Sequence, residues 1–225
     1  MIAYKTRMTR TTPFLIALLV LLAAGLIGAS FLSDKPVEEG VLAANEGHWC
    51  RSPLAAAVSR YGDWPELMLL GGAGYLLARR VRSVRWQRLL LSAMIASTLA
   101  GMAVNASRLT TGRTRPRAGA PQGWYGPYHD GRWLIGKADF NSFPSGHTAT
   151  AVGFAGVLLF GAPAWGSVAI AIAGLIAYSR LLLGAHHPSD VVAATVIALA
   201  VAWTVWEFLG KRGRVDVGKS VIGDS

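Results

Sequence analysis

The sequence has little charge and almost no cysteine, and each shortage excludes a class of protein. Charged residues make up only 15% of the 225 residues, and 52% of the residues are hydrophobic. Soluble domains contain about 25% charged residues, so the composition is that of an integral membrane protein. The only cysteine, Cys50, excludes an intramolecular disulfide and a metal cluster built on cysteine.

Several motifs that would mark other functions are also missing. The sequence has no Walker-type glycine-rich loop, no pair of histidines at the HExxH spacing and no repeat of fixed period. Acidic residues are few, and the 22 Lys and Arg against 12 Asp and Glu give a formal net charge of +10. Such a charge on a soluble protein suggests that it binds nucleic acid, but no basic run of this sequence is interleaved with aromatic residues. Basic residues also flank membrane spans, so we expect a lipid bilayer as partner and no nucleic acid.

Apolar runs of near-membrane length recur along the chain. The first run, 13–32, has twenty residues without a charge. This length favours a membrane span over the apolar core of a signal peptide. The small residues Gly28-Ala29-Ser30 leave cleavage by a signal peptidase as an alternative. The runs predict an all-α integral membrane protein, a six-helix bundle in one domain, 1–225, with a flexible tail at 211–225. The expected spans are 13–32, 65–80, 89–107, 148–162, 167–184 and 191–208.

The connecting segments differ in character. We expect a loop at 34–40 and a short helix at 53–61 lying at the membrane interface. The third span carries small residues that suit close helix packing, at positions 92, 93, 96, 97, 101 and 103. The polar loop 108–142 is the longest and is rich in Gly, Arg and aromatic residues.

The distribution of Lys and Arg predicts the orientation. The N-terminus has three, the 79–88 connector five and the C-terminal tail four. With six spans these segments share one side, which the positive-inside rule makes cytoplasmic. The expected location is therefore a bacterial inner membrane, crossed several times, with the opposite polar segments facing the periplasm.

Three polar segments fall at that outer face by alternation of the spans. They are 108–116, at the end of the third span; 144–147, Pro-Ser-Gly-His, at the start of the fourth; and 179–190, between the fifth and sixth. Arginine forks suit phosphoryl oxygens, and a Ser-Gly turn at a helix N-terminus adds amide donors. Two histidines in separate segments can divide the roles of nucleophile and general acid. The residue types predict a phosphate site.

The three segments resemble the motifs of the type 2 phosphatidic acid phosphatase superfamily, in its bacterial membrane lipid phosphatase branch. The family pattern is Lys-x6-Arg-Pro, Pro-Ser-Gly-His and Ser-Arg-x5-His-x3-Asp. The second and third are met in full at 144–147 and 179–190. The first is met with one departure, because Arg108 stands where the family usually has Lys.

The resemblance implies a metal-independent phosphatase without a cofactor. His186 would attack phosphorus and become a phosphohistidine, Asp190 would orient it, and His147 would protonate the leaving oxygen and later activate water. The phosphoryl oxygens would be bound by Arg108, Arg115, Ser145, Gly146 and Arg180. The substrate would be a phosphorylated membrane lipid such as phosphatidic acid, phosphatidylglycerol phosphate, undecaprenyl diphosphate or lipid A.

Alternatives stay open for the function and for single residues. A lipid-linked phosphotransferase would use the same site, and a non-catalytic lipid-binding or transport protein would keep the fold. We interpret Arg113, Arg117 and Arg132 as headgroup anchors, and His187 as a neighbour of the nucleophile rather than the nucleophile itself. The sequence does not determine the substrate or the oligomeric state.

Overall fold

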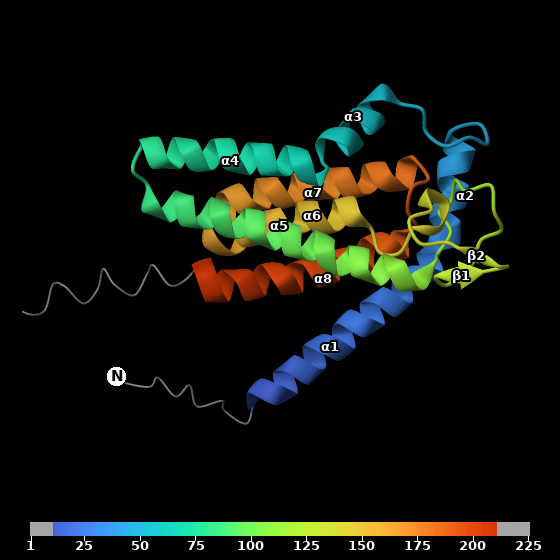
Figure 1. Ribbon diagram of the computed structural model, residues 1–225, viewed down its shortest axis with the longest axis horizontal. Helices are drawn as coiled ribbons and strands as arrows, with labels where there is room; N and C mark the ends of the chain where they lie inside the picture. The colour runs from blue at the N-terminus through green and yellow to red at the C-terminus, as the bar shows by residue number, and fades with distance from the viewer. Residues whose placement is uncertain (1–10, 211–225) are drawn as a thin grey trace, which may run out of the picture.

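The computed structural model describes residues 11–210 and has a helical bundle as its main body (Figure 1). Five helices run alongside one another in this bundle and three more lie beside it or at one end. The bundle helices are α4 (Trp64–Arg80), α5 (Val84–Thr111), α6 (Gly146–Gly161), α7 (Pro163–Leu182) and α8 (Pro188–Val205). The others are α1 (Thr11–Ser30), α2 (Asp34–Ala44) and α3 (Pro53–Tyr61).

Each expected span coincides with a helix, but the helices differ in length. Four helical stretches within the described residues are long and apolar enough to cross a membrane, namely Phe14–Ala44, Val84–Thr111, Pro163–Leu182 and Pro188–Gly210. Helices α4 and α6 have 17 and 16 residues. At 1.5 Å per residue they reach about 25 Å, less than the roughly 30 Å of a bilayer core. The expected tail 211–225 lies outside the described residues.

Helix α6 is the centre of the bundle and packs on α5, α7 and α8. Twelve of its 16 residues are buried. Small residues allow the close approach: a Cβ added to Gly153 would lie 3.0 Å from the Ala96 carbonyl oxygen of α5, and one added to Gly166 of α7 would lie 2.1 Å from the Leu159 Cα of α6. The small residues expected to pack on α5 are buried at positions 92, 93, 96, 97 and 101, whereas Ala103 is exposed.

The expected loop at 34–40 is wrong, because these residues form the start of α2. A 3-10 turn, η1 (Phe31–Ser33), joins α1 to α2 without a break in the helical path. The Ser33 hydroxyl donates to the Ser30 carbonyl at 2.6 Å, which satisfies a backbone acceptor at this junction. The carboxylate of Asp34 is held by α8 and by the loop after α5. Tertiary contacts therefore stabilise as helix a segment whose composition is that of a loop.

The loop after α5 covers the end of the bundle where α2 lies (Figure 1). It contains the hairpin of β1 (Tyr128–His129) and β2 (Arg132–Trp133), and the 3-10 turn η2 (Ala138–Phe140). Helix α5 ends at Thr111 and is followed by Gly112, whose φ of +56° is left-handed; a Cβ at Gly112 would lie 2.0 Å from the Gly126 carbonyl oxygen. Only glycine fits this turn, which directs the loop back across the bundle.

Candidate active site

The three polar segments meet at this covered end of the bundle. The Ser145 amide donates to the Asp190 carbonyl at 3.1 Å, which joins the start of α6 to the start of α8. The Arg108 Nε donates to the Pro144 carbonyl at 2.8 Å, which joins the last turn of α5 to the Pro-Ser-Gly-His segment before α6. The structure therefore brings together the candidate residues that lie far apart in the sequence.

His186 lies in the turn between α7 and α8 with its side chain fully buried. Its Nδ1 is 2.8 Å from the Ser142 carbonyl oxygen and 3.5 Å from Asp190 Oδ2, and its buried Nε2 has no hydrogen-bond partner. A carbonyl only accepts, so Nδ1 carries the hydrogen and Nε2 presents a lone pair. Burial lowers the pKa of His186 to about 3, against the opposing effect of Asp190. The imidazole is therefore neutral at physiological pH.

Asp190 is fully buried and shares its carboxylate among several donors. Oδ1 accepts from Arg113 at 2.6 Å. Oδ2 accepts from the Ser142 hydroxyl at 2.5 Å and from the His187 amide at 2.8 Å. These contacts fix the carboxylate beside the His186 ring, which is the position that an orienting aspartate needs.

Three arginines surround this centre with unused hydrogen-bonding capacity. Arg108 lies over the Pro-Ser-Gly-His turn. A Cβ added to Gly146 in that turn would be 3.0 Å from each of the two terminal nitrogens of Arg108. The buried Nε atoms of Arg115 and Arg180 have no partner. Burial, followed by the charge of Arg117, lowers the pKa of Arg115. The free donors and the clustered positive charge favour a bound anion.

Ser145 and Gly146 place a helix N-terminus at this centre. Ser145 is fully buried and precedes the first residue of α6, Gly146. Its hydroxyl accepts from Thr148 Oγ1 at 2.9 Å. The first amides of a helix lack intrahelical partners, so this end of α6 offers donors for an anion.

His147 faces a cavity of about 400 Å³ between α4, α5 and α6. The cavity is also lined by Arg108 and Gly146, and by the less polar Trp64 and Met102. The His147 Nε2 lies 3.5 Å from the Asp63 carboxylate. A substrate in this cavity would have its polar end at Arg108 and His147 and its other end toward Trp64 and Met102, which are exposed on the outside of the bundle.

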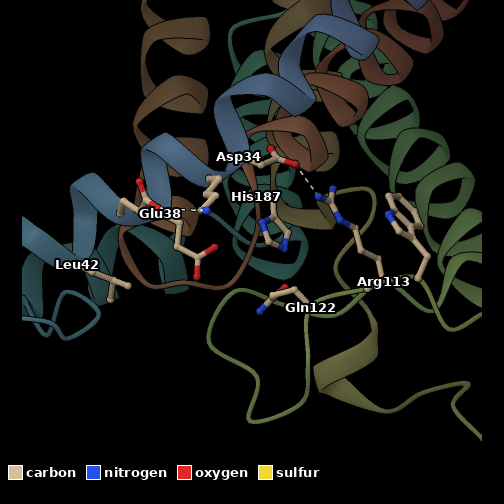
Figure 2. Close-up of a pocket in the computed structure, with 10 residues that line it drawn as sticks. Asp34, Glu38, Leu42, Arg113, Gln122 and His187 are labelled. Carbon is tan, nitrogen blue, oxygen red and sulfur yellow. Dashed lines mark hydrogen bonds and ion pairs between the residues drawn. The ribbon is translucent and has the colours of Figure 1, made fainter.

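Arg113 is not a headgroup anchor, and this expectation is wrong. Its residue surface is only 6% exposed, and it forms ion pairs with Asp190 and Asp34. The anchor interpretation fails because two carboxylates, one from α2 and one from α8, hold the guanidinium inside the protein. His187 is also buried, with Nε2 at 3.2 Å from the Thr114 carbonyl oxygen, and it lines a separate cavity beside α2 (Figure 2).

Sequence reasoning missed Asp34, Asp63, Ser142 and Ser59. Asp63 carries a local signal, since it precedes Trp64-Pro65 and its carboxylate accepts from the Trp64 amide as a helix cap. Ser59 accepts a short hydrogen bond from Arg180. Nothing local identifies Asp34 or Ser142, whose partners lie more than 40 positions away. Within residues 11–210 no group of three or more His, Cys, Asp or Glu side chains is arranged to hold a metal ion.

Comparison with known families identifies this arrangement. A family model of the PAP2 superfamily matches residues 88–214, which is more than half of the chain and includes all three polar segments. The chain belongs to the PAP2 superfamily. Its fold also resembles solved PAP2-type structures. The chain is 22% identical, with a TM-score of 0.52, to a transmembrane PAP2-type phosphatidylglycerolphosphate phosphatase from Bacillus subtilis, covering 86% of this chain and 93% of that one.

Other relatives of this PAP2 protein are lipid phosphatases. A lipid A 1-phosphatase from Rhizobium etli is 34% identical over 181 residues, covering 72% of this chain and 71% of the relative. A lipid A 1-phosphatase from Rhizobium johnstonii is 34% identical over 139 residues, covering 56% of this chain and 52% of the relative. The structure of Aquifex aeolicus LpxE aligns with a TM-score of 0.51 and 22% identity, over 76% of this chain and 94% of that one. This PAP2 protein is a multi-pass membrane lipid phosphatase.

Proposed function

We propose that this PAP2 protein removes the 1-phosphate of lipid A, or of a lipid with the same glycosyl phosphate, through a phosphohistidine on His186. The observation that carries the choice of substrate is the 34% identity to the lipid A 1-phosphatase of Rhizobium etli, spread over 72% of this chain. That match extends well beyond the three motifs, which are shared by phosphatases of many lipids.

The reaction has two displacements at phosphorus. In the first, the lone pair of His186 Nε2 forms the N–P bond while the P–O bond to the lipid breaks, and His147 gives a proton to the departing oxygen. In the second, His147 takes a proton from water, the water oxygen attacks phosphorus, and the N–P bond breaks to release inorganic phosphate. The neutral, partnerless Nε2 supports the first step.

The phosphoryl oxygens are held by the surrounding donors. Arg108, Arg115 and Arg180 supply positive charge where negative charge accumulates in the transition state. The amides at Gly146, at the start of α6, supply further donors. Asp190 stabilises the positive charge that His186 gains when its Nε2 bonds to phosphorus. None of these steps uses a metal ion.

Six spans and a periplasmic site form part of the same proposal. The beginning of α1, the connector between α4 and α5 and the end of α8 lie at one end of the molecule, opposite the site (Figure 1). The connector carries five arginines at 79–88, which supports a cytoplasmic location for that end. α4 and α6 would then complete the six spans in a locally thinned bilayer.

The test is phosphate release from four lipids in detergent with a chelator present: lipid A 1-phosphate, phosphatidic acid, phosphatidylglycerol phosphate and undecaprenyl diphosphate. We expect lipid A 1-phosphate to have the highest kcat/KM and His186→Ala to release no phosphate while staying in the membrane fraction. A kcat/KM for lipid A 1-phosphate that is no higher than for the other three lipids would refute the proposed choice of substrate. Label that moves from donor to a second lipid, with no free phosphate, would indicate phosphotransfer instead.

The intermediate has its own test. Acid-labile, base-stable label on the protein, formed from a ³²P-labelled substrate and absent in His186→Ala, is expected of a phosphohistidine at this position. Phosphate release that persists in His186→Ala would refute the covalent route.

A further inference from the structure

A buried guanidinium joins the N-terminal helices to the proposed catalytic centre. Arg113 Nη1 donates to Asp190 Oδ1 at 2.6 Å. Arg113 Nη2 donates to Asp34 Oδ2 at 2.6 Å, and Figure 2 shows this second contact. The Arg113 side chain is only 8% exposed, and the Asp34 side chain 13%. One arginine thus pairs with two carboxylates from opposite ends of the chain.

Asp34 is fixed to the start of α8 as well as to the arginine. Its Oδ1 accepts from the Ser189 amide at 2.9 Å, and its Oδ2 accepts from the Ser189 hydroxyl at 2.7 Å. The same hydroxyl oxygen accepts from Arg113 Nη1 at 2.7 Å. The three side chains therefore form a closed ring in which the guanidinium cannot turn without breaking a charged hydrogen bond.

Three aromatic rings surround the guanidinium. Its central carbon lies 5.1 Å from the ring centroid of Phe31, 4.8 Å from Trp124 and 5.9 Å from Phe143. The rings restrict water, which strengthens the charged hydrogen bonds inside, and their faces attract the cation. Phe31 lies in the turn just before Asp34, so this junction supplies both an aromatic wall and a carboxylate.

The ring of contacts holds the Oδ1 side of the Asp190 carboxylate, while the Ser142 hydroxyl and the His187 amide hold Oδ2. Arg113 occupies Oδ1, which leaves Oδ2 toward His186 Nδ1 at 3.5 Å and the Ser142 hydroxyl at 2.5 Å. We propose that Asp34 is a positioning residue for the phosphatase reaction: it anchors Arg113, and Arg113 holds the Asp190 carboxylate beside the nucleophile. The inference rests on the proposed role of His186. Asp34 lies outside the matched family segment 88–214.

The charge balance explains why the second carboxylate matters. With Asp34 present, Arg113 is held from both sides, between two carboxylates. Without the Asp34 carboxylate, the guanidinium is bound from one side only. It can then shift, and the Asp190 carboxylate can shift together with it. A misdirected carboxylate slows the chemical step, whereas substrate binding stays the same because neither Asp34 nor Arg113 contacts the proposed phosphate donors.

The first experiment compares Asp34→Asn with Glu38→Gln in the full-length protein. Glu38 lies one turn further along α2 and lines the same cavity of about 580 Å³, but it makes no hydrogen bond to Arg113 (Figure 2). We expect kcat of Asp34→Asn to fall about tenfold with KM unchanged, which is the lower end of the loss found for residues that orient the ligands of a metal ion. Glu38→Gln should match the wild type. Equal kcat in Asp34→Asn and wild type would overturn the inference.

The second experiment tests whether Asp34 acts through Arg113. In an Arg113→Ala background, Asp34→Asn should change kcat by less than twofold, because the link is already broken. A further tenfold fall would show that Asp34 acts by another route and would overturn the inference.

Chemical rescue covers the case in which Asp34→Asn does not fold. Arg113 borders the cavity beside α2, so guanidinium added to Arg113→Ala should enter and restore kcat at least fivefold. It should not restore Asp190→Asn, and it should leave kcat of Glu38→Gln unchanged. Folded Arg113→Ala that shows no rescue would overturn the role of the arginine.

The same experiments separate this inference from the proposed function. Label that is trapped on the wild type and absent in His186→Ala establishes the nucleophile, whatever Asp34→Asn does. If His186→Ala keeps its activity, the proposed function fails first.

Discussion

Asp190→Asn tests how His186, the proposed nucleophile, is oriented. In a serine protease triad the corresponding change costs about 10⁴-fold because the histidine takes the wrong tautomer. Here the Ser142 backbone carbonyl, at 2.8 Å from His186 Nδ1, is closer than the carboxylate at 3.5 Å. The substitution leaves that carbonyl in place. We therefore expect the tautomer to survive and only the electrostatic contribution of Asp190 to be lost.

The size of this contribution follows from the distance. A unit charge pair at 3.5 Å interacts by about 5 kcal/mol at an effective dielectric constant of about 20. Arg113, at 2.6 Å from the other carboxylate oxygen, offsets part of the field at His186. We expect kcat to fall by about 10²- to 10³-fold, less than in the protease, with KM little changed.

The substitution also removes one of the two charge partners of Arg113. Breaking a buried ion pair costs about 3–5 kcal/mol. Asp34 continues to pair with the guanidinium, so we expect the lower end of that range. Thermal unfolding in detergent measures this loss and shows whether the variant is folded at the assay temperature.

The assay is single-turnover phosphate release together with label trapped on the protein. Asp130→Asn is the matched control, because the Asp130 side chain is 87% exposed in the hairpin. A fall as large as that of His186→Ala would refute the role of the Ser142 carbonyl. A fall of less than tenfold would refute the electrostatic role of Asp190.

Three further predictions concern the leaving group, the packing and the pH dependence. His147→Ala should lower kcat at least tenfold more for an alkyl phosphate than for p-nitrophenyl phosphate, since only the poor leaving group needs a proton; equal losses would contradict the general-acid role. Gly166→Ala should prevent accumulation of folded protein in the membrane, because its Cβ would lie 2.1 Å from the Leu159 Cα, whereas Gly174→Ala meets nothing within 4 Å and should accumulate normally. The pKa of His186 is lowered to about 3 by burial, so below pH 6.5 the unfolded chain binds a proton that the folded protein excludes. The contribution of His186 to the free energy of unfolding should then fall by on the order of 1 kcal/mol for each unit of decreasing pH. The melting temperature of His186→Asn should therefore depend less steeply on pH than that of the wild type over this range.

The helices and the main candidate site residues could be predicted from local features of the sequence. Apolar runs predict α5, α7 and α8 because a helix in lipid satisfies its own backbone hydrogen bonds. The spacing of Arg108, Arg115 and the later motif residues could be read without a structure, because each motif lies within one short segment. Alternation of the expected spans then predicted that the segments meet at one face.

Partners of buried charges were decided only by the tertiary structure. Arg113 stands in a polar loop and Asp34 in a segment with the composition of a loop, and their positions differ by 79 residues. Charge and hydropathy patterns extend over a few residues and give no information about a contact at that separation. The same holds for the Ser142 carbonyl, which lies 44 positions from His186 and whose role depends on backbone direction rather than on residue type.

The sequence by itself determined that the protein is a helical membrane protein with two histidines, an aspartate and three arginines at one face. Only the tertiary structure decided which groups hold them in place. The physical reason is that residue type sets what a side chain can do chemically, whereas burial and a fixed partner depend on segments that meet only when the chain has folded.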